Sequence, residues 1–196
     1  AGLVAESLRE EGFDVVMTRE PGGTRTSEDI RKILLDPDRG EISPGAELLM
    51  YLAARAQLVS EVIGPALDAG RIVICDRFMD ASTAYQGWAR GLGEELVERL
   101  NGFAVGEAVP DATFLFDLPV ETGFSRGPDR READGVRRRD RLEREARDFH
   151  ERVREGYLRA AKRHPDRFVV IDAAKSLDEV VGEVRGNIRA RLDVQP

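Results

Sequence analysis

Two short stretches of the sequence carry side chains that could bind a phosphorylated ligand. In the first, CDRF, Asp76 and Arg77 directly follow the apolar run Ile72 to Cys75. A carboxylate at the end of a buried strand can hold magnesium directly or through water, and an arginine can bond a phosphate through two N–H groups. The alternative, which the preceding apolar run weakens, is that both residues are surface charges.

The second stretch, SxxYQG, runs from Ser82 to Gly87. Ser82, Tyr85 and Gln86 supply a hydroxyl, a phenol and an amide, which suit the edges of a nucleobase and the hydroxyls of a sugar. The alternative for Ser82 is that its side chain caps a helix.

A third stretch, TREPGGT from Thr18 to Thr24, follows another apolar run. Pro21 fixes one backbone angle, and the two glycines after it can take positive φ and let a ligand approach the main chain. Such a turn could hold Arg19 and Glu20 against that ligand. The alternative is that Pro-Gly-Gly only ends a strand and begins a loop.

A long helix is predicted from Ser43 to Ala69, with Ser43 as N-cap, proline at the first helical position and Gly70 just past the end. Helical periodicity places Arg55 within the apolar stripe of this helix, so its guanidinium must be paired. One interpretation is a buried salt bridge or a side chain that reaches the edge of the core. The other is that Arg55 bonds a planar base stacked on Tyr51. For Tyr51 itself, the alternative interpretation is ordinary core packing.

The elements that would position these stretches follow from four short apolar runs rich in valine, isoleucine or phenylalanine. They are Phe13 to Thr18, Ile72 to Cys75, Thr113 to Leu118 and Phe168 to Ile171. Each is typical of a strand buried on both faces of a parallel sheet, and stretches with helical spacing separate them. The sequence therefore predicts an open α/β sheet, with ligands at the carboxyl ends of its strands.

An arginine-rich stretch extends from Arg126 to Arg147. One interpretation is a solvated helix of alternating charge. The other is a mobile lid that brings arginines onto a transferring phosphate and excludes water. Phe149, Val153 and Tyr157 follow at helical spacing, which predicts a packed helix after this stretch.

The composition of the chain excludes several classes of protein and kinds of site. The 196 residues are 41% apolar and carry a net charge of -7, which is the wrong sign for a protein that coats nucleic acid. A single cysteine excludes an internal disulfide and a multi-cysteine zinc site, and it fits a reducing cytoplasm. No membrane span or signal peptide is predicted.

In order, TREPGGT, LLMYLAARAQLV, DRFMDASTAYQGWARGLG, PDATFLFDL and DRLEREARDFHERVREGY closely resemble the bacterial thymidylate kinases over nearly the whole chain. The resemblance implies a cytoplasmic, homodimeric P-loop kinase with one nucleoside monophosphate kinase-like domain, a parallel sheet flanked by helices, and a lid at about residues 122–147. Its reaction would be transfer of the γ-phosphate of ATP to dTMP, with Mg²⁺ and without nucleic acid or membrane partners.

The same resemblance implies roles for individual residues. Tyr51 matches the ring that stacks on thymine, and Arg55 the arginine that bonds a thymine carbonyl. Arg77 matches the clamp on the dTMP phosphate, Asp76 the acid near magnesium, and Tyr85 the tyrosine that favours deoxyribose. The remaining implied acceptor-site residues are Arg19, Glu20, Pro21, Ser82 and Gln86, and the implied catalytic residues of the lid are Arg138, Arg139 and Arg141.

The sequence departs from the family pattern in one large respect, because it contains no G-x-x-x-x-G-K-[ST] segment to hold the donor phosphates. AGLVAESLREEG looks like the helix that follows such a loop, so we expect the loop upstream and the 196 residues alone to be inactive. Two alternatives are a noncatalytic nucleotide-binding relative and a kinase for nucleosides or another nucleoside monophosphate.

Overall fold

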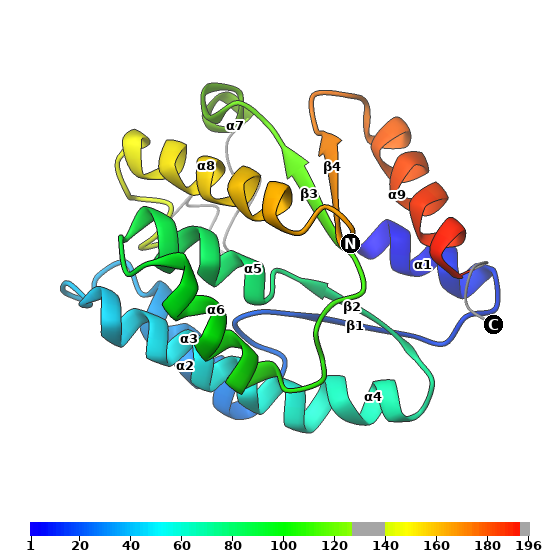
Figure 1. The fold of residues 1–196 in the computed structure, drawn as a ribbon, viewed down its shortest axis with the longest axis horizontal. Helices are drawn as coiled ribbons and strands as arrows, with labels where there is room; N and C mark the ends of the chain where they lie inside the picture. Colours follow the sequence, from blue (N-terminus) through cyan, green and yellow to red (C-terminus); the bar gives the residue numbers. More distant parts are fainter. Residues whose placement is uncertain (127–139, 193–196) are drawn as a thin grey trace.

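Strands and helices alternate along the chain, as Figure 1 shows for the computed structural model, which describes residues 1–126 and 140–192. The strands are β1 (Val15–Arg19), β2 (Ile72–Asp76), β3 (Thr113–Asp117) and β4 (Phe168–Asp172). The α-helices are α1 (Gly2–Glu10), α2 (Arg25–Leu35), α3 (Pro44–Leu58), α4 (Gly64–Asp68), α5 (Met79–Ser82), α6 (Glu94–Val105), α7 (Val120–Arg126), α8 (Arg147–Arg163) and α9 (Leu177–Leu192). Two wide-turn π-helical segments are η1 (Val59–Ile63) and η2 (Thr83–Ala89). The predicted α/β class is confirmed.

The strands form two parallel pairs. β1 lies beside β2, with Val15 opposite Ile72, and β3 lies beside β4, with Thr113 opposite Phe168. The prediction that all four runs are buried on both faces is wrong, because every residue from Ile72 to Cys75 is only half-buried and Phe116 is 49% exposed. The physical reason is that, within the described ranges, β2 and β3 each have a single hydrogen-bonded neighbour.

The carboxyl ends of β1 and β2 lie side by side. Arg19 is opposite Asp76 in the register, and the Glu20 N–H donates to the Asp76 carbonyl at 3.0 Å. In-register parallel pairing therefore brings the ends of TREPGGT and CDRF together, although 57 positions separate Arg19 from Asp76 in the numbering (76 − 19).

The predicted helix from Ser43 to Ala69 is helical throughout but is not one regular α-helix. It comprises α3, η1 and α4, with Pro44 in the first turn and Ala69 at the C-terminal end. Pro65 explains the wide turn, because proline has no N–H to donate to the carbonyl four residues earlier and its ring clashes there. Ser43 lies at the N-cap position, but its side chain makes no capping hydrogen bond.

Helix α8 packs closely across η2, as Figure 1 shows. A Cβ atom on Gly156 would lie 3.0 Å from backbone atoms of Ala84, so a larger residue would push the two helices apart. Phe149 and Val153 of α8 are buried, which confirms the packed helix predicted after the arginine-rich stretch. This contact holds the aromatic side of α8 against Tyr85. None of the helices described is both long and apolar enough to cross a membrane.

Candidate functional site

A small cavity lies at the carboxyl ends of β1 and β2, and most of the sequence-predicted acceptor residues meet there. Its walls come from the loop after β1, from α3, from the turn after β2, and from α5 and η2. The lining residues are Glu20, Tyr51, Arg55, Arg77, Ala81, Ser82 and Gln86. Parallel pairing of the strands and the packing of α3 against both loops thus bring together residues far apart in the sequence.

Arg55 forms a buried salt bridge with Glu20. The guanidinium is 1% exposed, and its Nε lies 2.8 Å from Glu20 Oε1 while its Nη2 donates to Glu20 Oε2 at 3.0 Å. Nη2 also donates to Ser82 Oγ at 2.9 Å, and Nη1 donates to Asn101 Oδ1. The salt-bridge interpretation of Arg55 is therefore confirmed.

These contacts do not use every donor of the guanidinium. Arginine has five N–H donors, and the contacts among the described residues use Nε, both N–H groups of Nη2 and one N–H of Nη1. Burial raises the pKa of the Glu20 carboxyl, and the charge and hydrogen bonds of Arg55 offset only part of that effect. A salt bridge and a hydrogen bond to a base are thus compatible roles for Arg55.

Tyr51 and Gln86 form the side of the cavity beside α3 and η2. Tyr51 is 5% exposed, and burial raises the pKa of its phenol to about 12, so the ring is neutral at physiological pH. Gln86 is buried, and its Nε2 donates to Glu47 Oε1 at 2.8 Å. Both side chains are positioned by contacts made within the protein.

Arg77 lines the cavity and has an uncommon backbone conformation, with φ of 64°. Its side chain is exposed, Nη1 donates to the Tyr85 hydroxyl at 3.3 Å, and Cζ lies 4.5 Å from the centroid of the same ring. Tyr85 is held edge-on against Phe149 and Tyr157 of α8, at 6.0 and 6.2 Å between ring centroids. The structure therefore joins Arg77 and Tyr85 as one unit, although Tyr85 does not line the cavity itself.

Asp76 is exposed at the end of β2, next to Arg77. Within residues 1–126 and 140–192, no cluster of three or more histidine, cysteine, aspartate or glutamate side chains could enclose a metal ion. A single carboxylate nevertheless fits Mg²⁺, which commonly keeps several waters and takes its other ligands from substrate phosphates. Asp76 could therefore hold the ion only in the company of bound nucleotide.

Most residues of the TREPGGT loop contact nearby parts of the protein and do not line the cavity. Gly22 and Gly23 have φ of 142° and 83°, as the turn chemistry predicted, and a Cβ on Gly23 would lie 2.5 Å from Thr18 Oγ1. The carbonyl of buried Pro21 accepts from Arg31 Nη1 at 2.8 Å. Glu20 alone of this loop reaches the cavity.

Arg19 does not line the cavity. Its exposed guanidinium donates to Glu28 Oε1 at 2.8 Å, and the Gly23 N–H donates to the same oxygen at 3.0 Å. Glu28 thus holds Arg19 against the loop, beside the site that the other acceptor residues form.

The part of the predicted lid that the structure describes begins with α7 and resumes at Asp140. Arg141 donates through Nη2 to buried Glu47, and through Nε to the Leu34 carbonyl at 2.8 Å. Its side chain therefore anchors the segment before α8 to α2 and α3, a position that the predicted catalytic role did not anticipate. Arg138 and Arg139 lie outside the described residues.

Sequence reasoning missed two buried polar residues that support the cavity, Glu47 and Asn101. Asn101 Nδ2 donates to the Met79 carbonyl at 3.0 Å, and its Oδ1 accepts from Arg55. Helical spacing could have found both, because Asn101 falls on the apolar face of α6 four residues after Val97. Glu47 precedes Tyr51 by one turn of α3.

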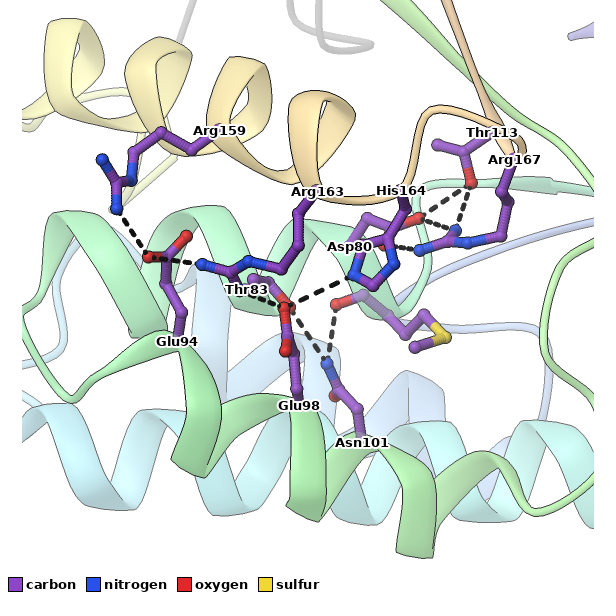
Figure 2. A network of polar contacts seen from close by, with 11 residues as sticks. Asp80, Thr83, Glu94, Glu98, Asn101, Thr113, Arg159, Arg163, His164 and Arg167 are labelled. Carbon is purple, nitrogen blue, oxygen red and sulfur yellow. Dashed lines mark hydrogen bonds and ion pairs between the residues drawn. The ribbon is translucent and has the colours of Figure 1, made fainter.

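Ion pairs hold α8 and the turn after it against α6 and α5, as Figure 2 shows. Arg163 reaches Glu94 at 2.9 Å and Glu98 at 2.5 Å, which ties the end of α8 to α6. Arg167 bonds both carboxylate oxygens of Asp80 in α5, at 2.6 and 2.7 Å. This network fixes the scaffold and contributes no side chain to the cavity lining.

A larger cavity, of about 460 Å³, lies between β3, α7 and α8. Its wall includes Asp117 and Arg154, whose Nε donates to Asp117 Oδ1 at 2.7 Å, together with Tyr157. None of the residues predicted for the acceptor nucleotide lines it. The smaller cavity is therefore the better candidate for the acceptor site, because its chemistry matches a nucleotide.

Comparison with known proteins identifies the family to which the chain belongs. The sequence model of the family described as thymidylate kinase matches residues 1–184. A thymidylate kinase of Desulfosudis oleivorans is 51% identical over 182 residues, covering 92% of this chain and 85% of the relative. One of Geobacillus thermodenitrificans is 47% identical over 192 residues, covering 98% of this chain and 84% of the relative. One of Geobacter sulfurreducens is 52% identical over 168 residues, covering 86% of this chain and 79% of the relative.

Proposed function

Because the chain belongs to the thymidylate kinase family, we propose that it transfers the γ-phosphate of ATP to dTMP and releases dTDP. The observation that carries the proposal is the cavity at the ends of β1 and β2, where an aromatic ring, a paired arginine, an amide and an exposed arginine converge. That set of side chains suits a base at one end and a phosphate at the other.

The thymine ring would lie against Tyr51, which offers a flat apolar surface and stays neutral. The remaining N–H of Arg55 would donate to a thymine carbonyl, with the guanidinium already held by Glu20, Ser82 and Asn101. Preorganisation of this kind lowers the entropic cost of ordering the side chain when the ligand binds. Tyr85 would lie beside the sugar, because its hydroxyl contacts Arg77.

Arg77 would clamp the dTMP phosphate and hold it in line with the donor. Little covalent chemistry is asked of the protein in phosphoryl transfer, so positioning and charge stabilisation supply most of the rate. Asp76 would hold the Mg²⁺ that accompanies ATP, and the ion would neutralise charge on the donor phosphates. Arg138 and Arg139 would add positive charge at the transferred phosphate.

The donor needs a phosphate-binding loop, and the 196 residues contain no G-x-x-x-x-G-K-[ST] segment. We therefore propose that these residues alone do not transfer phosphate. We place this protein in the cytoplasm, with dTMP and ATP as its small-molecule partners.

A nucleotide panel tests the proposal. With ATP and Mg²⁺, the gene product should phosphorylate dTMP with the highest kcat/KM, dUMP less well, and dCMP and thymidine hardly at all. Arg77 disfavours thymidine because it requires a monophosphate, and the donor that Arg55 presents to a carbonyl disfavours dCMP. Membership of the thymidylate kinase family places dTMP above dUMP. Tight dTMP binding without any transfer would instead favour a noncatalytic binding protein.

We also propose a homodimer formed through α3 and α6, which pack on each other through Leu48 and Val97. The outward sides of these helices expose Leu49 (62%), Leu96 (40%) and Phe103 (90%). Large exposed apolar side chains on adjoining helices are typical of a protein interface.

Phe103→Glu is expected to convert the dimer to monomers in sedimentation equilibrium at micromolar protein, because a carboxylate would be buried without a partner. Leu177→Glu is the matched control, since Leu177 is 65% exposed at the start of α9. A wild-type protein that sediments as a monomer, or a Phe103→Glu dimer, would contradict the proposed interface.

A further inference from the structure

A buried carboxylate that no motif singled out lies directly behind the cavity. Glu47 in α3 is 0% exposed. Its Oε1 accepts from Gln86 Nε2 at 2.8 Å and from Arg90 Nε at 3.3 Å. Its Oε2 accepts from Arg90 Nη2 at 3.4 Å and from Arg141 Nη2. Glu47 thus joins a cavity residue to two arginines from other parts of the chain.

Glu47 is ionised at neutral pH. Burial raises the pKa of a carboxyl, but the hydrogen bonds from Gln86 and Arg141 and the charge of Arg90 outweigh that effect and hold the pKa of Glu47 below its ordinary value. An ionised carboxylate can only accept hydrogen bonds. The two arginines therefore keep Glu47 in a state that has no proton to offer Gln86.

This state decides how the Gln86 amide is oriented. The NH₂ group must face Glu47, so the amide oxygen points away from Glu47, and we infer that this oxygen is the Gln86 atom presented to the cavity that the residue lines. Rotating the amide by half a turn would place its oxygen against the carboxylate and leave buried polar atoms unsatisfied, which is strongly unfavourable. The cavity therefore offers an acceptor from Gln86 and a donor from Arg55.

We propose that Glu47 is a positioning residue that selects the base of the acceptor nucleotide through Gln86. This inference rests on the proposed function of the cavity. Thymine and uracil have a donor at N3–H and an acceptor at O4, which complement the Gln86 oxygen and the Arg55 N–H. Cytosine has an acceptor at N3 and a donor at N4, so it would face acceptor with acceptor and donor with donor.

Glu47→Gln tests the inference, because a neutral amide can donate as well as accept and releases Gln86 into both orientations. Equilibrium affinities for dTMP, dUMP and dCMP are measured by titration. The preference for dTMP over dCMP should fall about tenfold or more. In the variant, dTMP loses one well-placed hydrogen bond to Gln86, and dCMP no longer faces acceptor with acceptor. The preference for dTMP over dUMP should not change, since both bases carry N3–H and O4.

Glu145→Gln is the matched control. Glu145 accepts from Arg90 Nη2 at 2.5 Å, so this variant removes a carboxylate from the same cluster without touching Gln86. Its preference for dTMP over dCMP should equal that of the wild type. An unchanged preference in Glu47→Gln would overturn the inference, as would an equal loss in Glu145→Gln, which would indicate general loosening of the cluster.

If Glu47→Gln fails to fold, the wild-type protein decides the matter. The Gln86 side-chain amide protons should exchange slowly with solvent, and fast exchange would overturn the inference. The affinities need no phosphoryl transfer, so the two proposals can fail separately. A protein that binds dTMP with the expected preference but never phosphorylates it would refute the proposed function alone.

Discussion

Replacing Arg77 with alanine is expected to lower kcat/KM for dTMP by about 10²- to 10³-fold, the usual loss when a preorganised charge-stabilising donor is removed. The variant should stay folded, because the Arg77 side chain is exposed and its contacts with Tyr85 lie at the surface. The backbone at φ of 64° is equally unusual for alanine, so the substitution adds no new backbone strain. Steady-state kinetics and thermal unfolding check both expectations.

Two further variants sharpen the test of Arg77. Arg77→Lys should fall between wild type and alanine, because lysine keeps the charge but cannot bond a phosphate through two parallel N–H groups. Arg71→Ala should match the wild type, since Arg71 precedes the other end of β2 and pairs with Asp14 at 2.8 Å. An Arg77→Ala enzyme that retains wild-type kcat/KM would show that the phosphate is held elsewhere.

Replacing Arg55 with alanine is expected to impair both stability and dTMP affinity. Removing one partner of a buried pair leaves Glu20 unpaired at 3% exposure, which costs about 3–5 kcal/mol and lowers Tm by roughly 10 °C. Affinity for dTMP should fall as well, because Arg55 is the proposed donor to the thymine carbonyl. Thermal unfolding and titration with dTMP measure the two effects separately.

A double variant separates the two roles of Arg55. Arg55→Met combined with Glu20→Leu should regain much of the lost stability, because apolar residues often replace a buried ion pair without cost. It should not regain dTMP affinity. Arg147→Ala is the control for loss of a surface pair, since Arg147 and Glu151 are both more than half exposed in α8. Unimpaired dTMP binding in the double variant would reduce Arg55 to a purely structural residue.

Local chemistry explains which features could be predicted from the sequence. Arg55 was placed on the buried side of its helix because helical periodicity depends only on nearby residues. The positive φ of Gly22 and Gly23 followed from turn chemistry in the same way. The end of β2 was predicted close to Asp76, so CDRF could be assigned to the carboxyl edge of a sheet.

Long-range packing explains what the sequence could not provide. Arg141 was predicted to act on phosphate, and its partner Glu47 lies 94 positions away, where no local pattern connects them. Asn101 bonds Arg55 across 46 positions, and only the packing of α6 on α3 brings them together. Burial of β2 was overestimated because burial depends on how many neighbouring strands cover a run as well as on its own apolar residues.

The most direct test of the central claim is a crystal structure of the protein with dTMP, because the cavity at the ends of β1 and β2 and the one between β3, α7 and α8 have different linings. The base should lie against Tyr51 with a carbonyl facing Nη1 of Arg55, and the phosphate should contact Arg77. Density for dTMP between β3, α7 and α8, beside Asp117 and Arg154, would contradict the proposed acceptor site.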